Sequence, residues 1–338
     1  MNYEIATPCE ILRFGTLFLF HRTRNDIVKH PVGVGFSLRV NSINSSLTIC
    51  KKKRRYMNRK IFLSLFFVML FSGMLNAGKK IVVLYTNDMM GCLDGEPALF
   101  INRDFPPPLG NAASCATYIK EEREKSVKKG YRLILLDAGN CFGNPQMGNL
   151  EVDKTVTYME RMKYDACAIG IYDTRLSETV LSDIFEKTSF SWLSANLISR
   201  RDGEYVGKLY KTIDCSGIKI GIFGLISEYG PIWVEKNIDE QFFFERENKR
   251  AEEMVSILKG NGCDIILGLT NVGFIHDSLL ADSIAGIDII IGGGEGRGMR
   301  EPFETPINHT IICRTYGKLS SVGRLELNID EKTRRIIG

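Results

Sequence analysis

The stretch LYTNDMMG (Leu84–Gly91) places a carboxylate directly after an apolar run. This pattern predicts a buried β-strand that delivers Asp88 to its carboxyl end, where α/β proteins commonly bind their ligands. A carboxylate in that place could hold a hydrolytic metal ion if nitrogen or oxygen ligands stood beside it. Two methionines, Met89 and Met90, follow instead. The sequence therefore indicates either an unusual metal site or one that has lost its ligands.

The elements that position Asp88 follow a regular pattern along the chain. Short apolar runs, such as 131–137, alternate with amphipathic segments, such as 111–130. Continuous apolar strands between helices predict an α/β fold with both faces of the sheet covered. Later strands with no helix between them predict a mixed sheet. The last two apolar segments, 310–317 and 322–330, have a hairpin-like pattern.

Eight segments, taken in order, resemble the 5'-nucleotidase branch of the calcineurin-like metallophosphoesterases. They are LYTNDMMG, LLDAGNCFG, YDACAIGIYD, LSANL, GIKIGIFGL, DIILGLTNVG, GIDIIIGGGEG and YGKLSSVGRLEL. The resemblance covers about residues 79–330. It implies a four-layer αββα sandwich of mixed sheets, with a two-metal site at the carboxyl ends of the strands.

The chemistry of that family requires two divalent cations about 3.5–4 Å apart, which activate a water molecule and neutralise the phosphate. An anionic bridge must offset their mutual repulsion, and His, Asp and Asn fill the other coordination positions. The resemblance implies eight such positions in this chain. They are occupied by Asp88, Met90, Asn140, Ile171, Tyr172, Asn271, Gly294 and Gly296.

Only Asp88 keeps the residue type that the resemblance implies. Met90 stands in place of the first histidine, and a thioether is a poor ligand for Mg²⁺, Mn²⁺ or Zn²⁺ in such a site. Asn140 replaces the bridging aspartate and lacks its charge. Ile171 replaces an asparagine ligand, and Tyr172 replaces the catalytic histidine.

The remaining three positions have also changed. Asn271, Gly294 and Gly296 stand where the resemblance implies histidines, and Asp173 stands where it implies a glutamate. Because the bridge, the imidazoles and the general acid are lost together, the two-metal site is expected to be lost and no cofactor is expected. We expect a catalytically inactive binding or structural module that binds a small anion or an unidentified protein.

Two alternatives remain open. The chain could be a residual phosphoester hydrolase with an atypical site, because Asp88, Asp173, Asn140 and Asn271 offer oxygen ligands to a hard cation. Alternatively, Met90, Cys92 and Cys141 could form a soft-metal or redox site, since thiolates and thioethers favour Cu(I). Cys92 and Cys141 could equally form a disulfide between the two loops.

The amino-terminal part has the pattern of an export signal. A basic segment is followed by an uncharged apolar run ending at Ala77, which predicts a signal peptide over residues 57–77. Residues 1–56 are expected to be a non-native upstream extension, and 78–338 the metallophosphoesterase-like domain. We therefore expect a periplasmic or extracellular protein with no membrane attachment after cleavage.

The charge of the domain excludes one class of partner. Residues 78–338 carry 32 Lys or Arg and 37 Asp or Glu, so their net charge is −5, whereas the whole chain has a net charge of +4. A mildly acidic domain offers no broad basic surface for a phosphate backbone. No nucleic-acid partner is expected.

Overall fold

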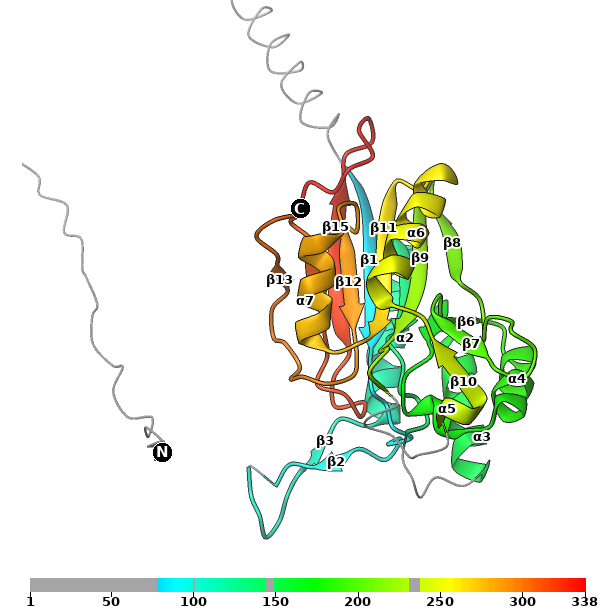
Figure 1. Cartoon of the computed structure of the whole chain (residues 1–338). Helices are drawn as coiled ribbons and strands as arrows, with labels where there is room; N and C mark the ends of the chain where they lie inside the picture. The colour runs from blue at the N-terminus through cyan, green and yellow to red at the C-terminus, as the bar shows by residue number, and fades with distance from the viewer. Residues whose placement is uncertain (1–77, 100, 144–148, 231–237) are drawn as a thin grey trace, which may run out of the picture. The chain divides into compact units, whose positions relative to one another are not determined.

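Two mixed β-sheets stack face to face in the structure, a computed structural model that describes residues 78–338 except 100, 144–148 and 231–237 (Figure 1). The upstream extension 1–56 and the signal peptide 57–77 expected from the sequence lie outside the described residues. Within the part that is described, no helix combines the length and the apolar character needed to cross a membrane.

The first sheet has a parallel centre and one antiparallel edge. In spatial order its strands are β15 (Gly323–Ile329), β1 (Lys79–Thr86), β4 (Arg132–Asp137), β5 (Ala166–Ala168) and β6 (Ser191–Leu193). Strands β1, β4, β5 and β6 run parallel, while β15 pairs antiparallel with β1. The loops that follow the parallel strands therefore meet at one edge of the sheet.

The second sheet also has a parallel centre, with an antiparallel strand at each edge. In spatial order its strands are β13 (Phe303–Glu304), β14 (Ile311–Cys313), β12 (Ile289–Gly292), β11 (Ile265–Asn271), β9 (Ile218–Ile226) and β8 (Tyr210–Cys215). The four central strands are parallel, and β13 and β8 pair antiparallel at the edges. Two small sheets pair β10 (Phe242–Phe244) with β7 (Leu197–Ser199) and β2 (Glu96–Pro97) with β3 (Pro108–Leu109).

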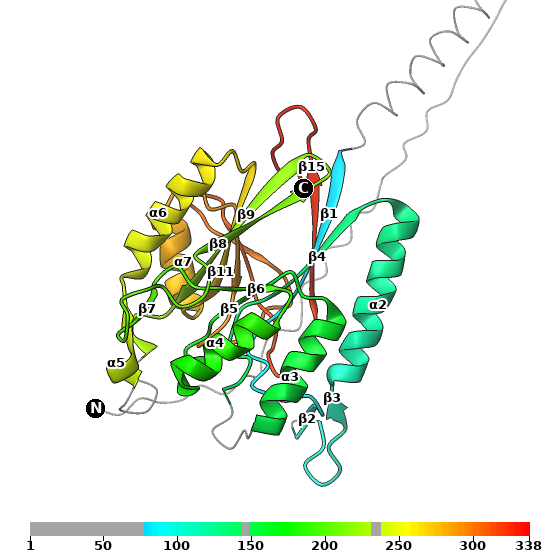
Figure 2. The same cartoon turned by 90° about the vertical axis from the view of Figure 1, so that its right-hand side faces the viewer.

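Helices cover the outer faces of both large sheets. They are α2 (Ala112–Lys129), α3 (Asn149–Met162), α4 (Glu178–Lys187), α5 (Ile238–Gln241), α6 (Glu247–Gly260) and α7 (Phe274–Ser283), with a 3₁₀ turn at Asp173–Arg175. Figure 2 shows α2, α3 and α4 on one side of the sheets and α6 and α7 on the other. Helix α2 begins where the Asn111 side chain accepts a hydrogen bond from the Ser114 amide, and it ends at the left-handed Gly130.

The alternation of side chains along β1 explains the layers. Val82 and Leu84 belong to the apolar cluster beneath α2, α3 and α4, whereas Ile81 and Val83 belong to the cluster between the two sheets. Successive side chains of a strand point to opposite faces, so a strand that is buried on both faces reads as one continuous apolar run. The expected four-layer arrangement of two mixed sheets between helices is confirmed.

The expected hairpin at the end of the chain is wrong. The segment 310–317 supplies β14 to the second sheet, and 322–330 supplies β15 to the first sheet, where it pairs with β1. Each strand finds an apolar partner strand elsewhere, so the two neighbours in sequence do not pair with each other. The loop between them thereby connects the two sheets at the edge where the parallel strands end.

Candidate functional site

A cavity of about 610 Å³ lies where the carboxyl ends of both sheets meet. All eight positions singled out in the sequence line it, namely Asp88, Met90, Asn140, Ile171, Tyr172, Asn271, Gly294 and Gly296. They come from the loops after β1, β4 and β5 in the first sheet and from the ends of β11 and β12 in the second. The structure therefore brings the whole predicted set together.

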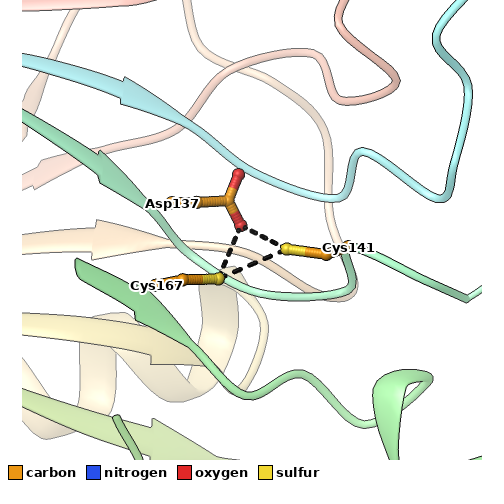
Figure 3. A group of neighbouring side chains, drawn as sticks. All are labelled: Asp137, Cys141 and Cys167. Atoms are coloured by element: carbon orange, nitrogen blue, oxygen red, sulfur yellow. Dashed lines mark hydrogen bonds between the residues drawn. The ribbon is translucent and has the colours of Figure 1, made fainter. Parts of the chain in front are cut away.

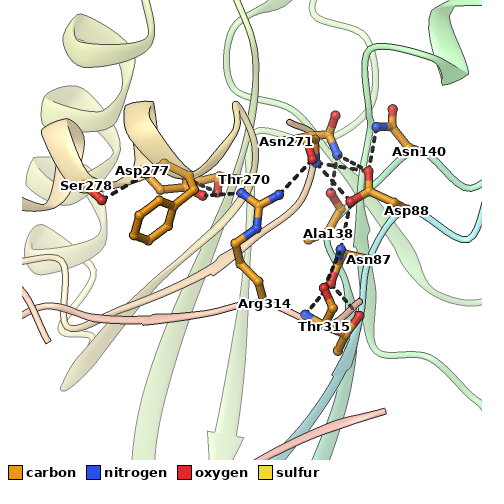
Figure 4. Close-up of polar contacts among 12 residues, drawn as sticks. Asn87, Asp88, Ala138, Asn140, Thr270, Asn271, Asp277, Ser278, Arg314 and Thr315 are labelled. Atoms are coloured by element: carbon orange, nitrogen blue, oxygen red, sulfur yellow. Dashed lines mark hydrogen bonds and ion pairs between the residues drawn. The ribbon is translucent and has the colours of Figure 1, made fainter. Parts of the chain in front are cut away.

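The carboxylate of Asp88 is surrounded by N–H donors (Figure 4). Asn87 Nδ2 donates to Oδ2 at 2.7 Å, and Asn140 Nδ2 donates to Oδ1 at 2.7 Å. The backbone N–H of Gly294 lies 3.0 and 3.1 Å from the two oxygens, and Asn271 Nδ2 lies 3.5 Å from Oδ1. Both oxygens of the Asp88 carboxylate are thus already hydrogen-bonded.

The side-chain amides of Asn87, Asn140 and Asn271 are oriented by the hydrogen bonds that their oxygens accept. Asn140 Oδ1 accepts from the Tyr172 amide at 2.9 Å, and Asn271 Oδ1 accepts from the Ile171 amide at 3.2 Å. Asn87 Oδ1 accepts from the Thr315 amide at 2.7 Å and from its hydroxyl at 2.6 Å. Because each oxygen faces a donor, each NH₂ group is directed away from the backbone amides. The NH₂ groups of Asn87 and Asn140 donate to Asp88, whereas that of Asn271 donates mainly to Ala138 O at 2.7 Å.

The backbone around Asp88 has an unusual conformation. Asp88, Met90 and Asn140 all have positive φ values, of 48°, 54° and 59°. Non-glycine residues rarely adopt this region, and they cluster at functional sites because the surrounding contacts must hold them there. Two of those contacts are backbone hydrogen bonds, from Asp88 N to Gly139 O at 2.9 Å and from Met90 N to Asn140 O at 2.8 Å.

A buried cation lies behind the Asp88 site. Arg314 is only 1% exposed, donates to Gly294 O at 2.7 Å and lies 3.5 Å from a carboxylate oxygen of Asp277. Burial raises the pKa of Asp88, while the hydrogen bonds from Asn87, Gly294 and Asn140 and the charge of Arg314 oppose this effect. Arg314 thus places a positive charge close to the Asp88 site.

The glycine segment 292–298 packs closely against its surroundings. Gly294 and Gly296 have φ values of +77° and +123°, which side-chain-bearing residues rarely adopt. A Cβ on Gly293 would lie 2.4 Å from Ala138 O, and one on Gly296 would lie 3.1 Å from the Cβ of Phe274. The positions that the resemblance assigns to histidines are held in a conformation that suits glycine.

Asp173 lies outside the cavity lining. Its carboxylate is fully buried and accepts three backbone hydrogen bonds, from Asn140 at 2.9 Å, Gly170 at 2.8 Å and Phe142 at 2.8 Å. It therefore braces the loop that carries Asn140. Burial raises its pKa to about 7, and the hydrogen bonds from Phe142, Gly170 and Asn140 oppose the rise.

The alternative of a disulfide between Cys92 and Cys141 is not realised in the structure, in which both are free thiols. Their loops do meet, through a backbone hydrogen bond from Gly91 N to Cys141 O at 2.8 Å. However, the Cys141 side chain is fully buried and contacts Cys167, whereas the half-buried Cys92 thiol contacts Met90 O at 3.7 Å. The three sulfur-bearing side chains of the predicted soft site do not converge.

Sequence reasoning missed several residues of the site. Asn87 and Thr315 form a hydrogen-bonded pair at its floor, and Lys318 forms an ion pair with Glu96 at its rim. Asn87 precedes Asp88 directly, so its place at the strand end was a usable signal. For Arg314 there was no such signal in the sequence, because this residue lies within an apolar run that predicts only a strand.

The two stacked mixed sheets, flanked by helices and carrying a site at their strand ends, define a metallophosphoesterase fold. The 5'-nucleotidase precursor from Thermus thermophilus superposes with a TM-score of 0.64 and 21% identity, covering 77% of this chain and 53% of that one. The calcineurin-like phosphoesterase YfkN from Bacillus subtilis superposes with a TM-score of 0.62 and 18% identity, covering 77% and 88%.

Sequence comparison supplies the relationship. The 5'-nucleotidase of Diplobatis ommata is 28% identical over 222 residues, which are 63% of this chain and 37% of that protein. The human 5'-nucleotidase is 26% identical over 227 residues, covering 63% and 38%. No protein-family model matches the chain. The chain is a homologue of the 5'-nucleotidases, in the calcineurin-like metallophosphoesterase family, and it spans less than two fifths of the length of these relatives.

Proposed function

We propose that this chain is an exported, non-catalytic binding protein built on a metallophosphoesterase scaffold. The observation that carries the proposal is the set of N–H donors around Asp88, which take the place of cations in holding its charge. The export part rests on the signal-peptide pattern of residues 57–77.

The side chains present do not fit a pair of divalent cations. A metal ion binds lone pairs, but Asn140 directs an N–H group toward Asp88, and Asn140 and Asn271 both use their oxygens for backbone amides. The bridging charge is lost at Asn140, and the loop at Gly294 and Gly296 disfavours bulky ligands in their place.

The two alternatives from the sequence have weaker support. The residual hydrolase needs oxygen ligands from Asp173, Asn140 and Asn271, and the oxygens of all three residues already accept hydrogen bonds from backbone amides. The soft site needs Cys92 and Cys141 to converge, and Cys141 instead lies in the core. We therefore do not propose either activity.

The charges of the cavity lining favour a neutral or cationic ligand over the small anion expected from the sequence. Among the described lining residues, Asp88, Glu96 and Glu295 are acidic, and Lys318 is the one basic side chain. Lys318 is paired with Glu96, so it is not free to hold a phosphate. An anionic ligand would therefore enter a negatively charged cavity with little compensation.

The proposal is tested by measuring hydrolysis of a 5'-mononucleotide and of a generic phosphodiester, with Mg²⁺, Mn²⁺ or Zn²⁺ offered separately. An active 5'-nucleotidase assayed in parallel serves as the positive control. We expect no turnover above the metal-only background with any of the ions. Turnover that depends on a metal and is lost in Asp88→Ala would overturn the proposal.

A further inference from the structure

We propose that Cys141 and Cys167 form a disulfide when the protein folds in an oxidising compartment. The inference rests on the export proposed above, but not on the absence of catalysis. The two Sγ atoms lie 3.3 Å apart in the structure (Figure 3). Among the seven cysteines of the described residues, no other pair makes a sulfur–sulfur hydrogen bond.

The fold brings the two residues together from neighbouring elements. Strands β4 and β5 are adjacent and parallel, with Asp137 directly opposite Cys167. The chain then turns back after β4 through Gly139 and Asn140, both with positive φ, which returns Cys141 to the same face. Asp173 holds this turn through its hydrogen bond to the Asn140 amide, so the sulfur–sulfur contact is part of a braced structure.

The surroundings of the sulfurs favour a neutral product. Both side chains are fully buried, and both contact Asp137 Oδ1, at 3.2 Å for Cys141 and 3.5 Å for Cys167. A metal bound by two thiolates would require two more negative charges beside a buried carboxylate, whereas a disulfide requires none.

After oxidation of the two cysteines, the neighbouring Asp137 carboxylate still accepts hydrogen bonds. Asp137 keeps its hydrogen bonds from the Thr86 hydroxyl at 2.6 Å and from the Gly139 amide at 2.8 Å. Only two weak S–H donors are lost. The apolar core around the pair therefore needs little rearrangement beyond the approach of the two sulfurs.

The oxidant is another disulfide, either a small molecule such as oxidised glutathione or an oxidoreductase. One cysteine thiolate attacks a sulfur of that disulfide and releases a thiolate, and the second cysteine then displaces the remaining thiolate. The two cysteines lose two protons and two electrons, and the oxidant becomes two thiols. Because both sulfurs are fully buried in the folded chain, the exchange takes place during folding.

The bond would fix the candidate site. It joins strand β5 to the loop that carries Asn140. The side-chain amide of Asn140 donates a hydrogen bond to Asp88. Closing the loop between residues 141 and 167 limits the unfolded chain and so stabilises the fold. The cavity would then be more rigid in the exported protein than in a reduced one.

The test uses the full chain, produced with its amino-terminal segment in a secreting host and recovered from the exported fraction. The protein is unfolded in denaturant with an alkylating reagent, digested and mapped by mass spectrometry. We expect a linked peptide pair containing Cys141 and Cys167 and alkylated thiols at Cys92 and Cys313. Alkylated thiols at both Cys141 and Cys167, with or without a bound metal ion, or a link from either to another cysteine, would overturn the proposal.

Thermal unfolding provides a second readout. Its main comparison uses the wild-type protein, so it does not depend on the folding of a cysteine variant. Wild-type protein refolded with reductant should melt about 5–10 °C lower than protein refolded with glutathione disulfide. Cys313→Ala, which removes a buried thiol with no sulfur partner, should show the same difference. Cys141→Ala and Cys167→Ala should show none. A difference that persists in both of these variants would contradict the assignment.

Discussion

At the scale of single residues, the charge of Asp88 is held by hydrogen bonds. The resemblance to the metallophosphoesterases implies that a carboxylate at this place binds a metal ion, together with other metal ligands. Here its partners are amide N–H groups from Asn87 and Asn140 and the backbone of Gly294. The residues around this carboxylate therefore offer it hydrogen-bond donors.

The substitution Asn140→Asp tests this exchange. It replaces an N–H donor 2.7 Å from Asp88 with a second carboxylate, so it removes a hydrogen bond and adds like-charge repulsion. We expect the free energy of unfolding to fall by about 1–3 kcal/mol, measured by chemical denaturation with a chelator present.

The matched control is Asn328→Asp, at an exposed position of β15. It should change the unfolding free energy by less than about 0.5 kcal/mol. Equal stability of Asn140→Asp and the wild type would mean that Asp88 does not depend on this donor.

At residue scale the sequence showed which residue types differ from those that the resemblance implies, because that depends only on residue identity at matched positions. It did not show how the asparagines are oriented. Their orientation is set by the amides of Ile171, Tyr172 and Thr315, which belong to other loops and come close only in the folded chain.

At the scale of elements, the pair Arg314–Asp277 joins β14 to α7 and supports the glycine segment 292–298. Both side chains are almost fully buried, and Arg314 also donates to Gly294 O. Substituting Arg314→Met leaves Asp277 buried without its cation. We expect a loss of about 3–5 kcal/mol in unfolding free energy, measured by chemical denaturation.

Two control variants test whether the loss of stability comes from the buried Arg314–Asp277 pair. Arg334→Met, at an ion pair whose arginine is 56% exposed, should cost less than about 1 kcal/mol. The double variant Arg314→Met/Asp277→Asn should lose less stability than Arg314→Met alone, because no buried charge is left unpaired. An additive loss in the double variant would contradict the coupling.

The sequence predicted most elements because their apolar patterns are local. It failed where pairing is decided by distant partners, as with β14 and β15, which join different sheets. The mostly apolar segment FSWLSANL (190–197) likewise does not form one strand, because β6 ends at Leu193 and β7 begins at Leu197. Asn196 explains the break, because its side chain hydrogen-bonds Ile226 and so ties this segment to the second sheet.

At the scale of the whole molecule, buried carboxylates link stability to pH. Burial raises the pKa of Asp137 to about 6 and the pKa values of Asp173 and Asp277 to about 7. An unfolded aspartate has a pKa of about 3.9, so the folded protein binds more protons than the unfolded chain between these values. This contribution is fully present below about pH 4 and is lost as the pH rises through 6 and 7.

We therefore expect the free energy of unfolding to fall as the pH rises from 5 to 8, measured by urea denaturation across that range. Asp277→Asn, which cannot titrate, should flatten part of the slope. Stability that rises steadily over the same range would show that these carboxylates are ionised in the folded protein.

The measurement that tests the central claim most directly is the metal content of the exported protein. The protein is incubated with excess Mn²⁺, Zn²⁺ or Mg²⁺, desalted and analysed by inorganic mass spectrometry, with an active 5'-nucleotidase treated in the same way. Because the amides around Asp88 present N–H groups, we predict far less than one metal ion per chain. Two metal ions per chain, lost on Asp88→Ala, would contradict the account.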